Sequence, residues 1–204
     1  ECLCALHRFV PNDESTVLPS VFALFPQLPA NILVPTLRAT ASKIIGKYAP
    51  WLAQHAEPYL PPLLPFLAQG LSIPQCVTSV VIAIKELACH MSSNFDICDN
   101  VLQLYSQVSQ SGKLVLEDEL QLLEAACRAL SYKVQDMARG GNGNNNATGP
   151  FLGALVNPIG QRLTNNLVDA NASARRAMAE VDRLVIVVQH LKVPTQSDGP
   201  HPIV

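Results

Sequence analysis

Apolar residues recur along the chain at alternating spacings of three and four, the pattern of a helix with one buried face. No stretch alternates apolar and polar residues with a period of two, as a half-exposed strand would. The pattern therefore predicts an all-α protein with essentially no sheet. Four segments have this apolar stripe, and we call them the striped helices. Their stripe residues are Leu33, Leu37, Ala41, Ile44 and Tyr48; Val77, Val81, Ile84, Ala88 and Met91; Leu116, Leu120, Leu123, Cys127, Leu130 and Val134; and Ala174, Met178, Val181, Val185, Val188 and Leu191.

A shorter helix is expected before each striped one. Proline suits the first turn of such a helix, because the N–H that it lacks would have no intrahelical partner there. Pro65 and Pro158 fall later, and we expect them to kink their helices or end them early. The predicted shorter helices are Glu14–Phe25, Pro58–Leu71, Phe95–Gln110 and Pro150–Leu167. The candidate N-cap residues are Asp13, Ser72, Asp96 and Ser173.

The chain also repeats itself with a period of about 42 residues. The segment Leu18–Phe22 recurs as Leu60–Leu64, and Lys43 recurs as Lys85 and then as Arg128. Two helices per period of this length are typical of HEAT or armadillo repeats. We therefore predict one continuous HEAT-repeat α-solenoid, a superhelical arch of antiparallel helix pairs and a fragment of a longer chain. Its parts are 1–12 (end of a preceding repeat), 13–56, 57–95, 96–149 and 150–192 (repeats, the third with a Gly/Asn-rich loop at 139–149) and 193–204 (linker).

The repeat places a basic residue at a matched position of every striped helix. In a stacked solenoid such positions would form a row along one face. Two interpretations stay open: the row meets an acidic partner surface, or its charges bond neighbouring repeats or are merely solvated. With the charges beside them, the candidate protein-binding residues are Lys43, Lys47, Lys85, Glu86, Glu124, Arg128, Arg176 and Arg183.

Two further features have alternative explanations. The acidic run Glu117–Glu119 begins a striped helix, where it complements the positive end of the helix dipole, or else forms a patch for a basic partner. Trp51, the one tryptophan, lies at a junction between repeats. It is expected either in a buried contact between repeats or as an exposed anchor for a partner.

Composition excludes several classes of protein. The 204 residues are 49% hydrophobic and 15% charged, which is too apolar for disorder and too poor in charge for a coiled coil. A net charge of −2 and 5% aromatic residues give no basis for nucleic-acid binding. No uninterrupted apolar run is long enough for a membrane span. None of the six cysteines forms a Cys-x-x-Cys pair, so we expect reduced, structural thiols.

The sequence contains none of the common catalytic signatures. A phosphate-binding loop, a Gly-x-Ser-x-Gly elbow and a His-Glu-x-x-His helix are all missing. The scattered histidines and cysteines do not have zinc-site spacing. We therefore expect a protein that is not an enzyme and has no cofactor or metal.

Short phrases around the first repeat junction resemble a known family. Trp51-Leu52-Ala53-Gln54-His55 leads into a helix containing Leu60-Pro61-Pro62-Leu63-Leu64, and a Pro-rich segment follows Val193. In these phrases and in its repeats the chain resembles karyopherins of the importin-beta superfamily. Karyopherins are superhelical HEAT solenoids that carry protein cargo through nuclear pores under control of the GTPase Ran.

The resemblance has several implications. The striped helices would line the concave, cargo-binding face. Ran-GTP would bind mainly through N-terminal repeats absent from this chain. Nucleoporins would be further partners, and the protein would shuttle between cytoplasm and nucleus. No direct nucleic-acid contact, membrane contact or homo-oligomer is expected. The alternatives are a HEAT scaffold that assembles a phosphatase or other multiprotein complex, and the helical domain of an enzyme.

Overall fold

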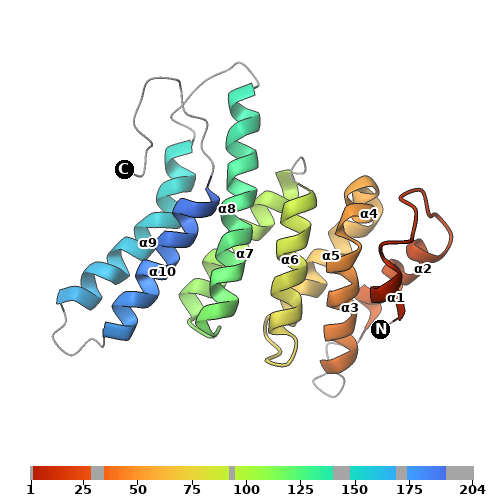
Figure 1. Cartoon of the computed structure of the whole chain (residues 1–204), viewed down its shortest axis with the longest axis horizontal. Helices are drawn as coiled ribbons and strands as arrows, with labels where there is room; N and C mark the ends of the chain where they lie inside the picture. The colour runs from red at the N-terminus through yellow and green to blue at the C-terminus, as the bar shows by residue number, and fades with distance from the viewer. Residues whose placement is uncertain (1, 29–34, 92–94, 140–147, 169–173, 192–204) are drawn as a thin grey trace. The chain divides into compact units, whose positions relative to one another are not determined.

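The structure, a computed structural model, describes residues 2–28, 35–91, 95–139, 148–168 and 174–191 (Figure 1). All regular secondary structure in these ranges is helical, and neighbouring helices pack in pairs as in HEAT-like proteins. The predicted all-α fold is therefore confirmed. No helix in the described part of the chain is both long enough and apolar enough to cross a lipid bilayer.

The chain divides into two compact units, residues 1–91 and 92–204. In each unit the predicted helices are present within a few residues of their expected bounds, but the helices at 56–70 and 148–168 are longer, not shorter, than the striped helices that follow them. The elements of unit 1 are α1 (Cys2–Leu6), α2 (Val17–Leu24), the 3-10 helix η1 (Phe25–Gln27), α3 (Pro35–Lys47), α4 (Ala49–Gln54), α5 (Ala56–Gly70) and α6 (Val77–His90). Those of unit 2 are α7 (Phe95–Ser111), α8 (Leu116–Arg139), α9 (Thr148–Val168) and α10 (Ala174–His190).

Two predicted segments fall largely outside the described residues. They are the Gly/Asn-rich loop at 139–149, of which 140–147 are not described, and the linker at 193–204. The prediction that the repeats form one continuous stack stays a prediction.

The striped helices α3 and α6 pack directly against each other in unit 1. Gly46 permits their close approach, because a Cβ atom there would lie 3.1 Å from the Cα of Ala83. Ile45, Val80 and Ile84 are buried beside this contact. Of the predicted stripes, Ala41, Ile44 and Tyr48 in the first segment and all five residues in the second are buried, whereas Leu37 is 47% exposed and Leu33 lies outside the described residues.

Trp51 lies in an aromatic cluster inside unit 1. It is 3% exposed, and its ring stacks on Phe22 of α2 at a centroid distance of 5.4 Å and on His55 at 4.2 Å. Its indole N–H donates a hydrogen bond of 3.0 Å to the backbone oxygen of Glu14. Trp51 is thus a buried structural residue and not an exposed anchor.

Three of the predicted N-caps are wrong. The carboxylate of Glu14, not Asp13, accepts the free backbone N–H groups of Thr16, Val17 and Leu18 at 2.6–2.8 Å. The helix after Ser72 begins only at Val77, because backbone hydrogen bonds first close a turn over residues 69–76. Asp96 lies inside the first turn of α7, and Ser173 lies outside the described residues.

We expected Pro65 and Pro158 to kink their helices or end them early. Neither proline ends its helix, and a kink stays a prediction. Helix α5 continues to Gly70 through three internal prolines, and α9 continues past Pro158 to Val168. In α5 the apolar side chains of Leu63 and Leu67 are fully buried on either side of Pro65. Burial of these side chains offsets the backbone hydrogen bonds that proline removes.

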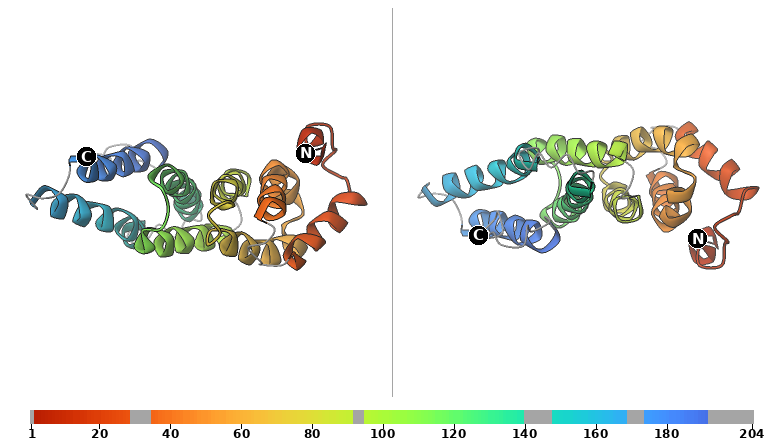
Figure 2. Two further views of the ribbon diagram at one scale, coloured as in Figure 1. Left: turned by 90° about the horizontal axis from the view of Figure 1, so that it is seen from below. Right: turned by 90° about the horizontal axis from the view of Figure 1, so that it is seen from above.

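Unit 2 has two layers. Both views of Figure 2 show α8 beside α10 in one layer and α7 and α9 in the other. Apolar residues of α8 such as Leu122, Leu123 and Leu130 fill the space between the layers together with Val101 of α7 and Ile159 of α9.

Helix α10 packs with a different face from the one that its apolar stripe predicts. Four stripe residues are exposed: Met178 (65%), Val181 (47%), Val185 (43%) and Val188 (56%). Positions 180, 183 and 187, on the opposite side of the helix, face the rest of unit 2, and of the stripe only Leu191 is buried. The prediction of a buried stripe is therefore wrong for α10. The buried side instead carries charged residues that find partners on α8 and α9.

None of the six cysteines forms a disulfide. Cys76, Cys98 and Cys127 are buried, and burial raises the pKa of all three thiols, that of Cys127 to about 12. These thiols are protonated near neutral pH and therefore unreactive, so they act as small core residues.

Candidate functional site

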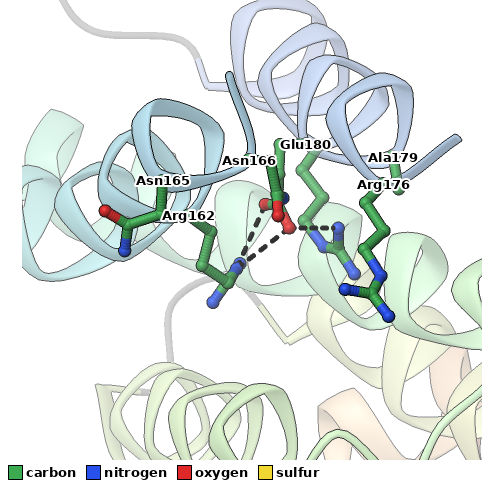
Figure 3. A pocket seen from close by; sticks show the side chains of 7 residues that line it. Arg162, Asn165, Asn166, Arg176, Ala179 and Glu180 are labelled. Carbon is green, nitrogen blue, oxygen red and sulfur yellow. Dashed lines mark hydrogen bonds and ion pairs between the residues drawn. The ribbon is translucent and has the colours of Figure 1, made fainter. Parts of the chain in front are cut away.

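A polar groove runs between α9 and α10 in unit 2 (Figure 3). Its volume is about 430 Å³. Three guanidinium groups, two amides and one carboxylate face it, so its surface is rich in hydrogen-bond donors and carries a net positive charge. The lining residues are Arg162, Asn165 and Asn166 from α9 and Arg176, Ala179, Glu180 and Arg183 from α10.

A network of ion pairs forms the floor of this groove. Arg183 donates two hydrogen bonds to the carboxylate of Glu119 on α8, at 3.0 and 2.5 Å, and a third of 3.0 Å to Glu180. Glu180 also accepts from Nε of Arg162 with both oxygens, each at 3.1 Å (Figure 3). Nη1 of Arg162 lies 3.4 Å from the hydroxyl of Ser109 on α7. The network thus joins all four helices of unit 2.

Burial and charge act in opposite directions on Arg183. Burial disfavours its charged form, but the hydrogen bonds and negative charge of Glu119, with Glu180, outweigh this effect and raise the pKa of Arg183. Arg183 therefore stays charged as a tie between α8 and α10. For this residue the geometry favours a bond between neighbouring helices over a contact with a partner.

Arg176 behaves differently from Arg183. It is exposed on the groove, and no hydrogen bond or ion pair of Arg176 is seen within the described residues. A guanidinium in this position can bind a carboxylate through two parallel hydrogen bonds. Arg176 is therefore the predicted site residue of unit 2 that is best placed to meet an acidic partner.

Glu124 and Arg128 lie one turn apart on α8 and pair with each other. Nη2 and Nε of Arg128 are 2.8 and 3.0 Å from the same oxygen of Glu124, and His190 of α10 approaches that oxygen at 3.8 Å. Glu124 is buried and Arg128 is half-buried. The structure brings together these two predicted residues, and their closest contact is with each other.

The acidic run that starts α8 has a structural explanation. Glu117, Asp118 and Glu119 occupy the first turn of the helix, where negative charge is favourable. Asp118 and Glu119 are buried, and Glu119 is the partner of Arg183. Only Glu117 is exposed, so the run does not form an acidic patch of three residues.

The remaining predicted residues lie on the two central helices of unit 1. Lys43 and Lys47 are exposed on α3, while Lys85 and Glu86 are half-buried on α6. Glu86 lies 3.9 Å from His90 of the same helix. Helix α3 packs on α6, so these four residues lie on two neighbouring helices. A single row that continues through both units stays a prediction.

Sequence reasoning missed the part of the groove that α9 supplies. Arg162, Asn165 and Asn166 lie on α9, whereas every candidate protein-binding residue was placed on a striped helix. One signal was available: Arg162 is the only charged residue in the predicted helix Pro150–Leu167. An isolated charge in such a helix requires a partner from another element, and Glu180 is that partner.

Comparisons with known proteins agree with this architecture. No protein-family model matches the chain. Its sequence is similar to that of a transportin. It is 23% identical to transportin MOS14 of Arabidopsis thaliana over 202 residues, which are 95% of this chain and 20% of the transportin. It is also 38% identical over 71 residues to the uncharacterized protein C11G11.07 of Schizosaccharomyces pombe, covering 35% of this chain and 7% of that protein.

The chain spans about a fifth of the length of the transportin that it matches. The similarity extends along nearly the whole chain and thus through both units. The similarity supports the resemblance to importin-beta karyopherins as a family. It does not identify an individual member of that family, such as importin-13.

Proposed function

We propose that this chain is a segment of a nuclear transport receptor that binds protein cargo. The observation that carries the proposal is the similarity to a transportin over 95% of the chain, on a fold of paired helices. Such a fold offers long helical surfaces to a partner protein, and we infer no catalytic role for it.

More specifically, we propose that the receptor is a karyopherin similar to importin-13, with transportin-3 as a near relative. Its cargo would bind along the striped helices α3, α6, α8 and α10. Ran-GTP would bind mainly through repeats outside this chain, nucleoporins would be further partners, and the receptor would shuttle between cytoplasm and nucleus. The resemblance of the residues around Trp51 and Leu60 supports this assignment.

The mechanism would couple cargo to Ran through the shape of the helix stack. Each repeat contacts only its neighbours, so small rotations between helix pairs add along the stack. Cargo and Ran-GTP would favour different arrangements, so that each changes the affinity for the other. Import cargo would leave when Ran-GTP binds, and export cargo would bind together with it.

Within this chain, the proposed contacts for an acidic cargo surface are Arg176 on the groove and Lys43 and Lys47 on α3. All three side chains are exposed. Arg183 would act indirectly, because its contacts with Glu119 and Glu180 hold α10 in place.

The deciding experiment is a binding assay of the complete gene product with immobilised Ran. Ran locked in its GTP form should retain the protein, and Ran-GDP should not. Equal retention on both forms, or on neither, would contradict the proposal. A HEAT scaffold would instead co-purify with the subunits of its complex whatever nucleotide Ran carries.

A further inference from the structure

A second, smaller cavity lies between α7 and α9 in unit 2. Its volume is about 100 Å³, room for several water molecules and therefore for one side chain. Tyr105 and Leu155 are buried on its wall, whereas Ser106, Ala154 and Pro158 are exposed around its mouth. The complete lining is Leu102, Tyr105, Ser106, Ser109, Gln110, Ala154, Leu155, Pro158 and Arg162.

Two buried polar atoms on residues that line this cavity have no hydrogen-bond partner within the described part of the protein. They are the hydroxyl of Tyr105, a residue only 5% exposed, and Nη2 of Arg162. Burial raises the pKa of Tyr105 and the nearby Ser109 lowers it, but the two hydroxyl groups do not form a hydrogen bond. The Ser109 hydroxyl donates to Glu119 instead. Buried polar groups are nearly always paired, so these two atoms indicate a missing acceptor.

The charge around the cavity restricts what that acceptor can be. Nε of Arg162 is bound to Glu180, and Glu180 and Glu119 together neutralise Arg162 and Arg183. An added carboxylate would be a charge without a counter-charge in a partly desolvated site, which is unfavourable. A neutral carbonyl group would satisfy the donors without this cost.

We propose that this cavity receives the carboxamide side chain of an asparagine or glutamine on a cargo protein. The amide oxygen has two lone pairs and would accept from both Nη2 of Arg162 and the hydroxyl of Tyr105. The methylene groups of the side chain would pack on Leu102, Leu155 and Pro158. As a cargo contact, the site rests on the proposed function, but the binding of an amide to the cavity does not.

The test is a titration of the full chain with pentanamide, a primary amide on an apolar stem, followed by NMR of the leucine methyl groups. Pentanoate, which has the same stem and a carboxylate, is the comparison probe. We expect pentanamide to shift the Leu102 and Leu155 methyl signals to saturation, and pentanoate to bind about tenfold more weakly or less. Tyr105→Phe should weaken pentanamide binding about two- to tenfold, the effect of one hydrogen bond.

Ala154→Leu fills the mouth of the cavity from an exposed position and should abolish the saturable shifts. Gln103→Leu, an exposed change on α7 that does not line the cavity, is the matched control and should bind as the unchanged chain does. The proposal is overturned if pentanamide gives no saturable shift, if pentanoate binds equally well, or if Ala154→Leu binds normally. The Ran assay is independent of these results, so failure of the cavity and failure of the transport function are distinguishable.

Discussion

Arg183 on α10 holds the carboxylate of Glu119 on α8 with two hydrogen bonds across 64 residues of sequence. The side chains are only 11% and 9% exposed. This pair, extended by Glu180 and Arg162, fixes the position of α10 against the rest of unit 2. With the charged side of α10 turned inward, its apolar side is left exposed.

Breaking this pair should destabilise the chain strongly. Arg183→Met leaves the buried Glu119 carboxylate without its partner, and we expect a loss of about 3–5 kcal/mol. The matched control is Arg175→Met, which removes an exposed arginine of the same helix and should cost less than about 0.5 kcal/mol. Urea denaturation followed by circular dichroism measures both. Equal, small losses would mean that Arg183 is not a structural tie.

The N-terminus of α2 should show a pH-dependent stability that depends on Glu14. Hydrogen bonds from the backbone of Val17, Leu18 and Thr16 lower the pKa of Glu14 below its ordinary value of 4.5. A carboxyl group with a lowered folded-state pKa stabilises the fold above its unfolded pKa, and this contribution is lost as the pH falls through the folded-state pKa.

Glu14→Gln should therefore lower the melting temperature at pH 7, with the difference from the unchanged chain shrinking below pH 4.5. Fluorescence of Trp51, the one tryptophan, reports on this region because its indole bonds the backbone of Glu14. Asp13→Asn is the control and should have little effect at either pH. A difference that persists unchanged at low pH would rule out the carboxylate as its source.

The α3–α6 contact should not tolerate a side chain at position 46. A Cβ there approaches the Ala83 backbone to 3.1 Å, so we expect Gly46→Val to cost about 1–3 kcal/mol through overpacking. Gly160 of α9 has nothing within 4 Å of the equivalent atom, and Gly160→Val should change the stability by less than about 0.5 kcal/mol. Thermal denaturation compares the two; a neutral Gly46→Val would show that the helices can separate at little cost.

Charge reversal at Arg176 should weaken the binding of an acidic cargo. We expect Arg176→Glu to reduce the affinity of the complete gene product roughly three- to tenfold, with the effect falling as salt is added. Arg175→Glu changes the neighbouring exposed residue, which does not line the groove, and is the control. Calorimetric titration with the cargo distinguishes them. Equal losses would point to a general effect of charge and not to the groove.

Truncating a side chain should destabilise the chain more on the buried side of α10 than on the exposed side. Val187 is fully buried, and Val187→Ala should cost about 1–3 kcal/mol, whereas Val185→Ala, on the exposed side, should cost less than about 0.5 kcal/mol. Urea denaturation of the full chain measures both. A large loss at Val185 would mean that the predicted stripe is buried after all.

The helices could be predicted from the sequence because their signal is local. The three-four spacing around Ile44, Ile84 and Leu123 is a property of single helices, and it gave the type and approximate bounds of the elements. The roles of Glu14 and Arg162 could not be predicted in this way. Glu14 caps α2 from two residues before the N-cap position, which Thr16 occupies, and the partner of Arg162 lies 18 residues away on another helix.

The orientation of α10 was mispredicted for a related reason. Its apolar stripe outnumbers its buried charges, so periodicity alone turns Met178 and Val185 inward. The charged side faces inward instead, because Glu180 and Arg183 find partners on α8 and α9, and no property of α10 alone encodes those partners. Of the predicted site residues, the structure joins Glu124 with Arg128 and leaves Lys43, Lys47 and Arg176 exposed.

The exposed methionine and valines of α10 should also affect the dye binding and the solubility of the purified chain. An exposed apolar strip runs along this helix and consists of Met178, Val181, Val185 and Val188. Such strips bind hydrophobic dyes and one another. The chain should therefore be retained on phenyl resin and brighten anilinonaphthalene sulfonate while fully folded. Two or three lysines placed on this strip should raise the solubility of the chain without altering its fold.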